Sequence, residues 1–479
     1  MKQTDFRSAP FFRVASTSCL SLVLILAACS KSSTPAPAPP PPLGAPQAVA
    51  ATGITDSSFI AHWHSVSGAM SYNVFIATDN AFSSPLSGYN PKSVSDTSLT
   101  ATPVVAGTTY YYKVVPVGAS GAGPSASNII QVAVLGATAD EFVFIGSQDD
   151  SLYCLNASTG TRVWATATGD LINSSPTIYN NLVFAGSNDK RLHAFDMRTG
   201  IEKWHFQTNG SIVSSATVSN GILYVGSFDG FVYALDANTG SQKWSVYSAR
   251  LPNTLVFSSP TAVNGEVYIG NFDDSVYGYD ALTGVKNLAA PTAGMVESSP
   301  AVVNGIVYAA SNDKHVYAWN IALSSQVWSY PTRLNVIASP TLNNGVVYIG
   351  SGDSSMYALD ASTGALKWSA ATGGGISSSA LVNGGVVYAG SEDGKVYAFD
   401  AITGTIKWST PTGASVQSSP VVSNGIVYIG SNDKKVYALD AHSGAVQWSF
   451  ATNGQVFSSP CIWTYDGKMI ESAISGDVQ

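Results

Sequence analysis

The sequence is poor in charge, in cysteine and in long apolar runs. Only 11% of the 479 residues are charged and the formal net charge is −8, which argues against nucleic acid or anionic lipid as a main partner. The four cysteines include no adjacent pair and no Cys-x-x-Cys-His sequence, so no c-type haem site is expected. No segment has the roughly 20 consecutive apolar residues of a membrane-spanning helix. Glycine, serine, threonine and asparagine abound instead, which suits an extracytoplasmic β protein with many turns.

The start of the chain predicts an export signal. A positively charged stretch leads into an apolar run, residues 20–26, that is too short to span a membrane stably. The run ends in Leu26-Ala27-Ala28-Cys29, which resembles a bacterial lipobox. This resemblance implies removal of residues 1–28 and lipidation of Cys29; the alternative is an ordinary signal peptide with a chance cysteine. No aspartate follows Cys29, so we expect an outer-membrane lipoprotein that faces the periplasm or the cell surface.

Two further segments precede the main part of the chain. Residues 29–44 are rich in proline, alanine and serine, and we expect a semi-rigid tether there. Residues 45–134 alternate apolar and polar residues in short runs, which predicts a small all-β domain. This region resembles a fibronectin type III domain through Trp63, Tyr72 and Tyr110. The resemblance implies a β-sandwich with these aromatic side chains between its two sheets.

A tryptophan recurs through residues 141–479. The step is 40 residues, except for 44 residues between Trp244 and Leu288, and Leu288 stands where another tryptophan would fall. Each repeat holds four short alternating runs, and most contain an Asn-Gly turn such as Asn424-Gly425, which suits a two-residue hairpin. The pattern predicts an all-β fold, an eight-bladed β-propeller. The inner strand that closes the ring comes from residues 458–463 or from residues 134–138. The recurring residues are Trp164, Trp204, Trp244, Trp328, Trp368, Trp408 and Trp448.

The element Ala-x-Asp-x-x-Thr-Gly-x-x-x-Trp, as in residues 234–244, 358–368 and 398–408, carries a family resemblance. It resembles the PQQ-like, quinoprotein-type propeller repeat, and the lipoprotein propeller resembles the eight-bladed lipoproteins of the BamB group, from which the fibronectin-like domain is a departure. The resemblance implies that the recurring tryptophans dock between neighbouring blades. The fourth repeat departs with Leu288, and the fifth with Ser324-Ser325 and an extra tryptophan. We expect these departures to mark either a docking surface or drift.

The repeats offer no evident reactive centre. One aspartate recurs in every copy within a Ser-x-Asp turn, where its carboxylate can accept backbone N–H bonds, so a turn role is expected. Quinoprotein dehydrogenases use an adjacent Cys-Cys disulfide, calcium ligands and an aspartate base, and the sequence lacks the Cys-Cys pair. We therefore expect the fold without the enzyme: no catalytic residues, no cofactor and no metal. The pair His62 and His64 has no third ligand in view and predicts a solvated strand surface.

The residue before each Ser-Ser segment varies most between repeats. If these residues begin the inner strands, they form a ring at one mouth of the central channel. Only Glu297 among them can ionise, which is too few oxygen ligands for calcium. The ring comprises Asn173, Val213, Phe257, Glu297, Ile337, Ser377, Gln417 and Phe457.

The leading hypothesis is a non-enzymatic, lipid-anchored scaffold that binds proteins of the cell envelope. The BamB resemblance implies outer-membrane β-barrel assembly components among its partners. A surface adhesion or carbohydrate-binding protein is the alternative, and a PQQ-dependent dehydrogenase is a third. Cys154 and Cys461 fall in the first and last repeats, which a ring joins in one blade. A strand between them would keep their α-carbons too far apart for a disulfide, so two buried thiols are expected.

Overall fold

The computed structural model describes residues 42–52, 54, 58–105, 108–134, 141–248, 250, 252, 254–464 and 468–471. The predicted signal 1–28, Cys29 and most of the tether lie outside these residues. The described residues form 41 strands and no helix, so none of their segments is a helix that could cross a membrane. The chain divides into two compact units, residues 1–135 and 136–479.

The first unit contains two antiparallel sheets. One has the order β1-β2-β5 and the other the order β4-β3-β6-β7, with β8 also paired to β6. The strands are β1 (Ala48–Thr52), β2 (Phe59–Trp63), β3 (Ser71–Ala77), β4 (Lys92–Val94), β5 (Ser98–Ala101), β6 (Thr109–Gly118), β7 (Gly121–Ala122) and β8 (Ile130–Ala133).

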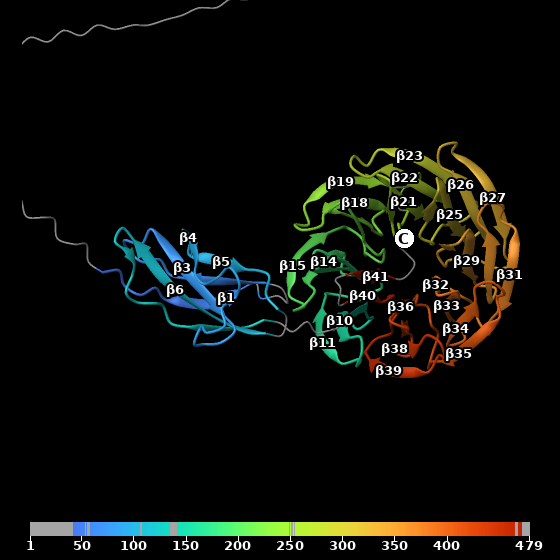
Figure 1. Ribbon diagram of the computed structural model, residues 1–479. Helices are drawn as coiled ribbons and strands as arrows, with labels where there is room; N and C mark the ends of the chain where they lie inside the picture. Colours follow the sequence, from blue (N-terminus) through green and yellow to red (C-terminus); the bar gives the residue numbers. More distant parts are fainter. Residues whose placement is uncertain are drawn as a thin grey trace, which may run out of the picture. The chain divides into compact units, whose positions relative to one another are not determined.

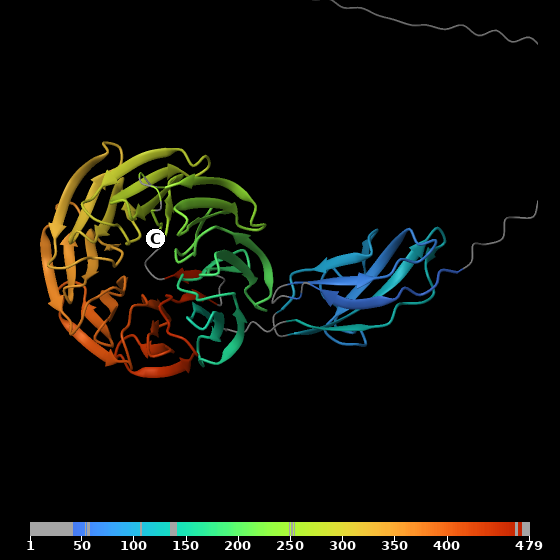
Figure 2. The ribbon, with the colours of Figure 1, turned by 180° about the vertical axis from the view of Figure 1, so that it is seen from behind.

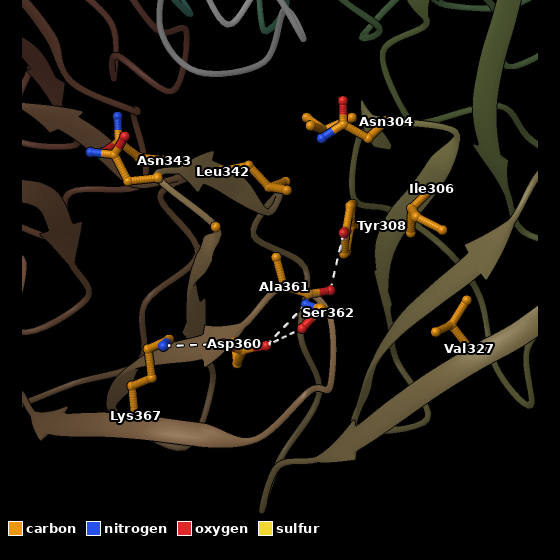
Figure 3. Close-up of a pocket in the computed structure, with 13 residues that line it drawn as sticks. Asn304, Ile306, Tyr308, Val327, Leu342, Asn343, Asp360, Ala361, Ser362 and Lys367 are labelled. Atoms are coloured by element: carbon orange, nitrogen blue, oxygen red, sulfur yellow. Dashed lines mark hydrogen bonds and ion pairs between the residues drawn. The ribbon is translucent and has the colours of Figure 1, made fainter.

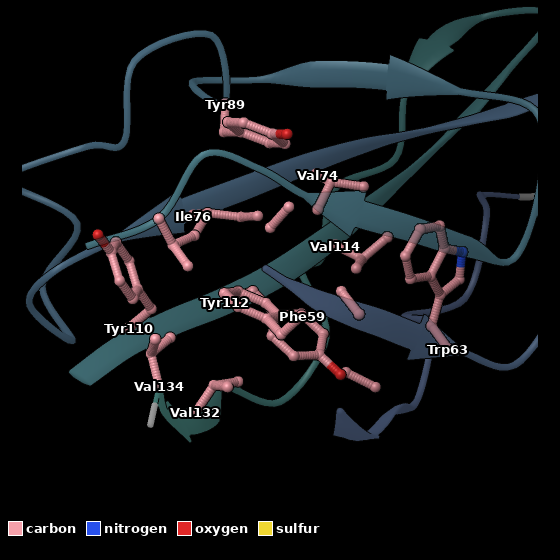
Figure 4. Close-up of a cluster of buried hydrophobic side chains, with 14 of the residues drawn as sticks. Phe59, Trp63, Val74, Ile76, Tyr89, Tyr110, Tyr112, Val114, Val132 and Val134 are labelled. Atoms are coloured by element: carbon pink, nitrogen blue, oxygen red, sulfur yellow. The ribbon is translucent and has the colours of Figure 1, made fainter. Parts of the chain in front are cut away.

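Aromatic side chains fill the space between these two sheets (Figure 4). Burial alternates along β6, as the period of two in a strand requires, and this turns Tyr110 and Tyr112 inward. The Trp63 ring meets the Tyr72 ring edge-on at 5.6 Å between centroids. His62 lies on the other face of β2, where its Nε2 is 2.7 Å from Thr52 Oγ1. Hydrogen bonding to a neighbouring strand therefore accounts for this histidine.

The second unit is a ring of sheets around a central channel (Figures 1 and 2). Its described residues form eight antiparallel sheets, numbered here 1 to 8 in the order of their second strands. The inner strands, nearest the channel, are β40 (Cys461–Trp463), β12 (Thr177–Tyr179), β16 (Thr217–Ser219), β20 (Thr261–Val263), β24 (Ala301–Val303), β28 (Thr341–Asn343), β32 (Leu381–Asn383) and β36 (Val421–Ser423).

The other strands lie further from the channel. The second strands are β9 (Phe142–Gly146), β13 (Leu182–Gly186), β17 (Ile222–Gly226), β21 (Glu266–Asn271), β25 (Ile306–Ser311), β29 (Val346–Ser351), β33 (Val386–Ser391) and β37 (Ile426–Ser431). The third strands are β10 (Ser151–Asn156), β14 (Arg191–Asp196), β18 (Phe231–Asp236), β22 (Ser275–Asp280), β26 (His315–Asn320), β30 (Ser355–Asp360), β34 (Lys395–Asp400) and β38 (Lys435–Asp440). The outer strands are β11 (Arg162–Ala167), β15 (Glu202–Gln207), β19 (Gln242–Tyr247), β23 (Lys286–Pro291), β27 (Ser325–Pro331), β31 (Leu366–Ala371), β35 (Ile406–Pro411) and β39 (Val446–Ala451).

Sheet 1 joins strands from opposite ends of the unit. Its order is β11-β10-β9-β40-β41, so β40, which lies in the candidate segment 458–463, supplies the inner strand. Of the other candidate segment, residues 135–138 lie outside the described residues. β41 (Met469–Glu471) then pairs with β40 on the channel side. In the ladder, Phe144 of β9 lies opposite both Cys154 and Cys461. The two buried cysteines are thus two strand spacings apart, roughly 10 Å, which is beyond disulfide reach.

The turns divide between the two ends of each sheet. Because neighbouring strands are antiparallel, the first–second and third–outer turns lie at one end of a sheet. The second–third turns and the connections to the next sheet lie at the other end, called here the mouth end. Asn-Gly turns such as Asn424-Gly425 lie at the first of these ends, and both residues have positive φ, 48° and 77°. That backbone is the one that a type I′ hairpin turn needs.

Candidate functional site

The recurring tryptophans lie against the next sheet of the ring. The Trp368 indole Nε1 donates to the Ala401 carbonyl oxygen at 3.0 Å, and Trp448 donates across the closure to Ala157 at 2.9 Å. Each indole ring also covers a glycine of the neighbouring Thr-Gly turn, or of Ser443-Gly444 in the case of Trp408. At Gly404, which has φ of 73°, an added Cβ would lie 2.6 Å from the Trp368 ring. The Thr-Gly element therefore serves both a left-handed turn and close contact with the tryptophan.

Tyrosines of the second strands reinforce this contact. The Tyr348 hydroxyl donates to the same Ala401 oxygen at 3.1 Å, and its ring lies 5.9 Å from Trp368. The Ala401 carbonyl oxygen thus accepts two hydrogen bonds from the preceding sheet, one from Tyr348 and one from Trp368. Tyr224, Tyr308, Tyr388 and Tyr428 make the equivalent bond.

The departures in the fourth and fifth repeats form one packing arrangement. Leu288 is 3% exposed and Trp319 is 2% exposed, and both belong to the same buried cluster between sheets 4 and 5. Ser324 takes the left-handed position, with φ of 48°, that glycine holds in other repeats. A smaller residue in one sheet is therefore accompanied by a larger one in the next. This burial favours compensation over a docking surface at Leu288 and Trp319.

The recurring aspartate of the Ser-x-Asp turn links neighbouring sheets. Asp393 Oδ2 accepts bonds from the Tyr397 hydroxyl at 2.6 Å and from the backbone N–H of Gly373, in the preceding sheet, at 3.1 Å. Its Oδ1 accepts the N–H of Lys395 in its own turn. Asp393 thus has the expected turn role, and the cross-sheet bond is an addition to it; Asp273, Asp353 and Asp433 make the cross-sheet bond, but their buried Oδ1 atoms have no partner among the described residues. The eight aspartates are Asp149, Asp189, Asp229, Asp273, Asp313, Asp353, Asp393 and Asp433.

Raising the pH above about 10 should destabilise the ring. Burial first, and then the bond to the aspartate carboxylate, raises the pKa of Tyr153, Tyr357 and Tyr397 from 10.0 to about 12. The folded state favours the neutral phenol, so this stability is complete below pH 10 and is lost as pH rises toward 12. Thermal unfolding followed by circular dichroism, alongside tyrosinate absorbance, checks this. A Tyr397→Phe variant should lose less stability over that range. An unchanged fold with its tyrosines ionised would contradict the prediction.

A second acidic column caps the turns at the opposite end. Asp400 Oδ1 accepts the N–H and hydroxyl of Thr403, and its Oδ2 lies 3.2 Å from Lys407 Nζ. The Thr403 backbone bond and Lys407 lower the pKa of Asp400 to about 2. Four sheets carry this Asp–Lys pair, whereas sheets 1 and 5 have asparagine and valine at the two positions: Asn156 with Val163, and Asn320 with Val327.

The eight predicted channel residues lie at the mouth end. They do not begin the inner strands as expected; Asn173, for example, precedes β12 by four residues, in the connection from sheet 1. The Ser-Ser-Pro segment adopts an irregular conformation because its serines hydrogen-bond across strands and sheets. Ser418 Oγ accepts the Gly430 N–H, and Ser419 donates its N–H to Ser459 Oγ.

A second set of residues, which the sequence analysis missed, lies beside this ring. Each is the residue before the recurring aspartate, within a Ser-x-Asp turn or, at Phe272, an Asn-x-Asp turn. Within one sheet, each member follows the residue of the first ring that it contacts by fifteen positions. Asn312 Nδ2 donates to Glu297 Oε1 at 2.7 Å, and Asn432 Nδ2 donates to Gln417 Oε1 at 3.1 Å. Variability at this position of an otherwise regular turn was the available signal. The set is Gln148, Asn188, Phe228, Phe272, Asn312, Gly352, Glu392 and Asn432.

The two rings together are polar in one sector and aromatic in another. Phe257 is 40% exposed, and its ring lies 5.9 Å from that of Phe228 and 6.0 Å from that of Phe272. Met295, also 40% exposed, lies in the next connection at the same end. An exposed cluster of phenylalanine and methionine is typical of a surface that contacts proteins. Among the predicted ring residues, Phe257 is thus the one at an aromatic surface.

The residues do not fit a quinone cofactor with calcium. Across the described residues, no three side chains of histidine, cysteine, aspartate or glutamate come together in a way that could hold a metal ion. Glu297 and Glu392, the acids of the two rings, accept bonds from Asn312 and Ser377. The two cysteines of this unit lie in one sheet with a strand between them. The donors that such a cofactor needs are therefore not assembled there.

Comparisons with known proteins agree with this architecture. Solved structures with the same fold include BamB from Moraxella catarrhalis (21% identity, TM-score 0.52, covering 63% of this chain and 92% of that one). A europium-containing methanol dehydrogenase (14%, TM-score 0.56, covering 64% and 83%) and the computationally designed Ika8 protein (18%, TM-score 0.54, covering 63% and 95%) also match. At these identities the likeness concerns the fold alone. No curated protein matches the sequence.

A family match is more specific. Residues 120–330, 286–380 and 370–468 match the family described as outer membrane protein assembly factor BamB. These overlapping matches run through well over half of the chain and include every tryptophan of the repeat. Together with the ring of sheets, they confirm the expected β-propeller of PQQ-like repeats. The chain therefore belongs to the outer membrane protein assembly factor BamB family.

Proposed function

We propose that the chain is an eight-bladed, non-enzymatic scaffold that binds proteins in the cell envelope, as a BamB-like component of outer-membrane protein assembly. The single observation that carries this proposal is the BamB family match, which continues through the repeats from residue 120 to residue 468. In this proposal Cys29 carries the lipid anchor, residues 29–44 form the tether, and residues 45–134 form a fibronectin type III-like spacer. The protein sits at the outer membrane.

Two features of the ring support a binding role. The recurring aspartates are the most numerous groups in the ring that could act in acid–base chemistry. Each of them accepts a hydrogen bond from a backbone N–H of the neighbouring sheet. Their carboxylates are thus committed to holding the ring together. The aromatic sector around Phe257 offers instead an apolar surface at the mouth end. Aromatic residues dominate the energetics of protein interfaces.

A pull-down from detergent-solubilised outer membranes tests this function. The tagged protein should retain β-barrel assembly proteins, and Phe257→Ser should reduce that retention by about tenfold, since a central aromatic contributes roughly 1–2 kcal/mol or more to an interface. Leu282→Ser is the matched control, because Leu282 is an exposed apolar residue of sheet 4 at the opposite end. Recovery of glycans alone would favour the carbohydrate-binding alternative. Dye-linked alcohol oxidation after addition of quinone and calcium would overturn the non-enzymatic proposal.

A further inference from the structure

A cavity of about 570 Å³ opens between sheets 5 and 6, at the end away from the mouth (Figure 3). Its base is formed by Tyr308 and Ala361, which are joined by the hydrogen bond between the two sheets. In Figure 3, Ile306 and Val327 of sheet 5 stand on one side and Leu342 of sheet 6 on the other. The cavity is therefore apolar at its walls and lies outside the channel and its two rings.

Side chains at three repeat positions leave more room here than at the junction between sheets 1 and 2. At the equivalent junction between sheets 1 and 2, Trp463 of the first strand faces Phe142 of the second strand. At the junction between sheets 5 and 6, the corresponding facing residues are Val303 and Ile306. The residue after the turn-capping acid is Met197 there and Ala361 here. The large residues of the first junction pack into a buried cluster. At these three positions, the side chains at the junction between sheets 5 and 6 have less volume than those at the junction between sheets 1 and 2.

The entrance is apolar where other sheets carry a charge. Val327 is 47% exposed and occupies the position that is Lys203, Lys243, Lys367 and Lys407 in four other sheets. The one lysine at the cavity, Lys367, lies 3.1 Å from the Asp360 carboxylate of its own sheet. The two charges at the rim neutralise one another, so the cavity favours an uncharged ligand.

Amide groups surround the entrance. The side chains of Asn304, Asn343 and Asn344 line the cavity and make no hydrogen bond with any described residue. Asn304 and Asn344 occupy left-handed turn positions, which accounts for their residue type, but Asn343 has φ in the ordinary range of a strand. Each amide offers a donor and an acceptor, the same pair that a peptide group presents. An extended peptide across the entrance would satisfy these groups.

We propose that this cavity is a docking site for an uncharged, extended segment of a partner protein, which inserts a bulky aromatic or aliphatic side chain between sheets 5 and 6. The inference rests on the proposed scaffold function and gives it a second contact surface, distinct from the aromatic sector at the mouth. Apolar walls take the side chain, and the asparagine amides bond to the backbone on either side of it.

The probe is a short capped peptide of alternating threonine and phenylalanine, labelled with a fluorophore, with fluorescence anisotropy as the readout. The full chain should bind it, and replacing its phenylalanines with serine should abolish binding. Val327→Lys, which copies the residue of four other sheets, should weaken binding by about tenfold or more, as loss of one anchor does. Val163→Lys, the same change in sheet 1, should leave affinity within about twofold. Equal affinity for the two lysine variants would overturn the proposal, as would the absence of any binding.

A photoreactive phenylalanine in the same peptide locates the site independently. Cross-links should fall on β25, β27 or β28, whereas cross-links confined to Phe228, Phe257 or Phe272 would overturn the cavity proposal. The membrane pull-down separates the two proposals. If Val327→Lys loses the peptide while the unmodified chain retains no envelope protein, the cavity stands and the scaffold function fails. If envelope proteins are retained but the peptide does not bind, the opposite holds.

Discussion

Deleting residues 461–479 should abolish the cooperative unfolding transition of the propeller. The deletion removes β40, the inner strand of sheet 1, and with it Cys461 and Ile462, which are fully buried. Burying one such side chain contributes roughly 1.5–3 kcal/mol, and each lost ladder bond to β9 costs about 1 kcal/mol. The loss approaches the whole stability of an ordinary domain, about 5–15 kcal/mol. Calorimetry of the truncated and full chains measures it.

Two shorter deletions serve as controls. Removing residues 472–479 leaves both β40 and β41 in place, so the unfolding temperature should stay within about 2 °C of the full chain. Removing residues 465–479 takes away β41 but keeps β40, and should give an intermediate loss. The truncation at 461 should also aggregate, since it exposes the edge of β9. A soluble, cooperatively folded chain without β40 would show that the ring does not depend on this closure.

The second large effect is expected at the contacts between sheets. Trp368→Ala should lower the free energy of unfolding by about 3–5 kcal/mol, the range for removing a large buried aromatic side chain. Trp368 is 8% exposed, and its indole packs on Gly404 and bonds to the Ala401 oxygen. Denaturant titration of the variant measures the change. A loss below about 1 kcal/mol would mean that the indole contributes little to the stability of the contact between the two sheets.

Two phenylalanine variants separate the contribution of indole packing from that of the indole hydrogen bond. Trp368→Phe removes both some volume and the Nε1 donor. Trp204→Phe removes similar volume, but the buried Trp204 Nε1 has no partner among the described residues. Trp368→Phe should therefore cost about 0.5–1.5 kcal/mol more than Trp204→Phe, the net contribution of one hydrogen bond. Equal losses would assign the effect to packing alone.

Much of the fold follows from local signals in the chain. The 40-residue step, the Asn-Gly turns and the alternating runs each specify a strand or a hairpin, and the structure has four-stranded sheets at those places. The candidate closing segment 458–463 also contains β40. These features depend on backbone preferences and side-chain period within one repeat, which is the range over which sequence patterns carry information.

The relations between repeats were much harder to predict. The sequence predicts only a turn role for Asp393. Its hydrogen bond with the backbone N–H of Gly373 forms because the ring places the preceding sheet beside it. Leu288 and Trp319 are separate irregularities along the chain, but they belong to one buried cluster between sheets 4 and 5. The second ring at the mouth was also missed, because its contacts, such as that of Asn312 with Glu297, join a turn to the connection fifteen positions before it. Contacts of this kind arise from tertiary geometry, which a repeat period alone does not specify.

The pairing of β9 with β40 has a consequence for biosynthesis. The first three strands of sheet 1 precede the other seven sheets in the chain, and the strand that completes them, β40, follows all seven. Until β40 is available, the chain carries an unpaired hydrogen-bonding edge, which is prone to pair with other chains. Correct folding of this propeller therefore requires β40 to reach β9 before another chain does. A chaperone that shields residues 142–146 would have its greatest effect during that interval.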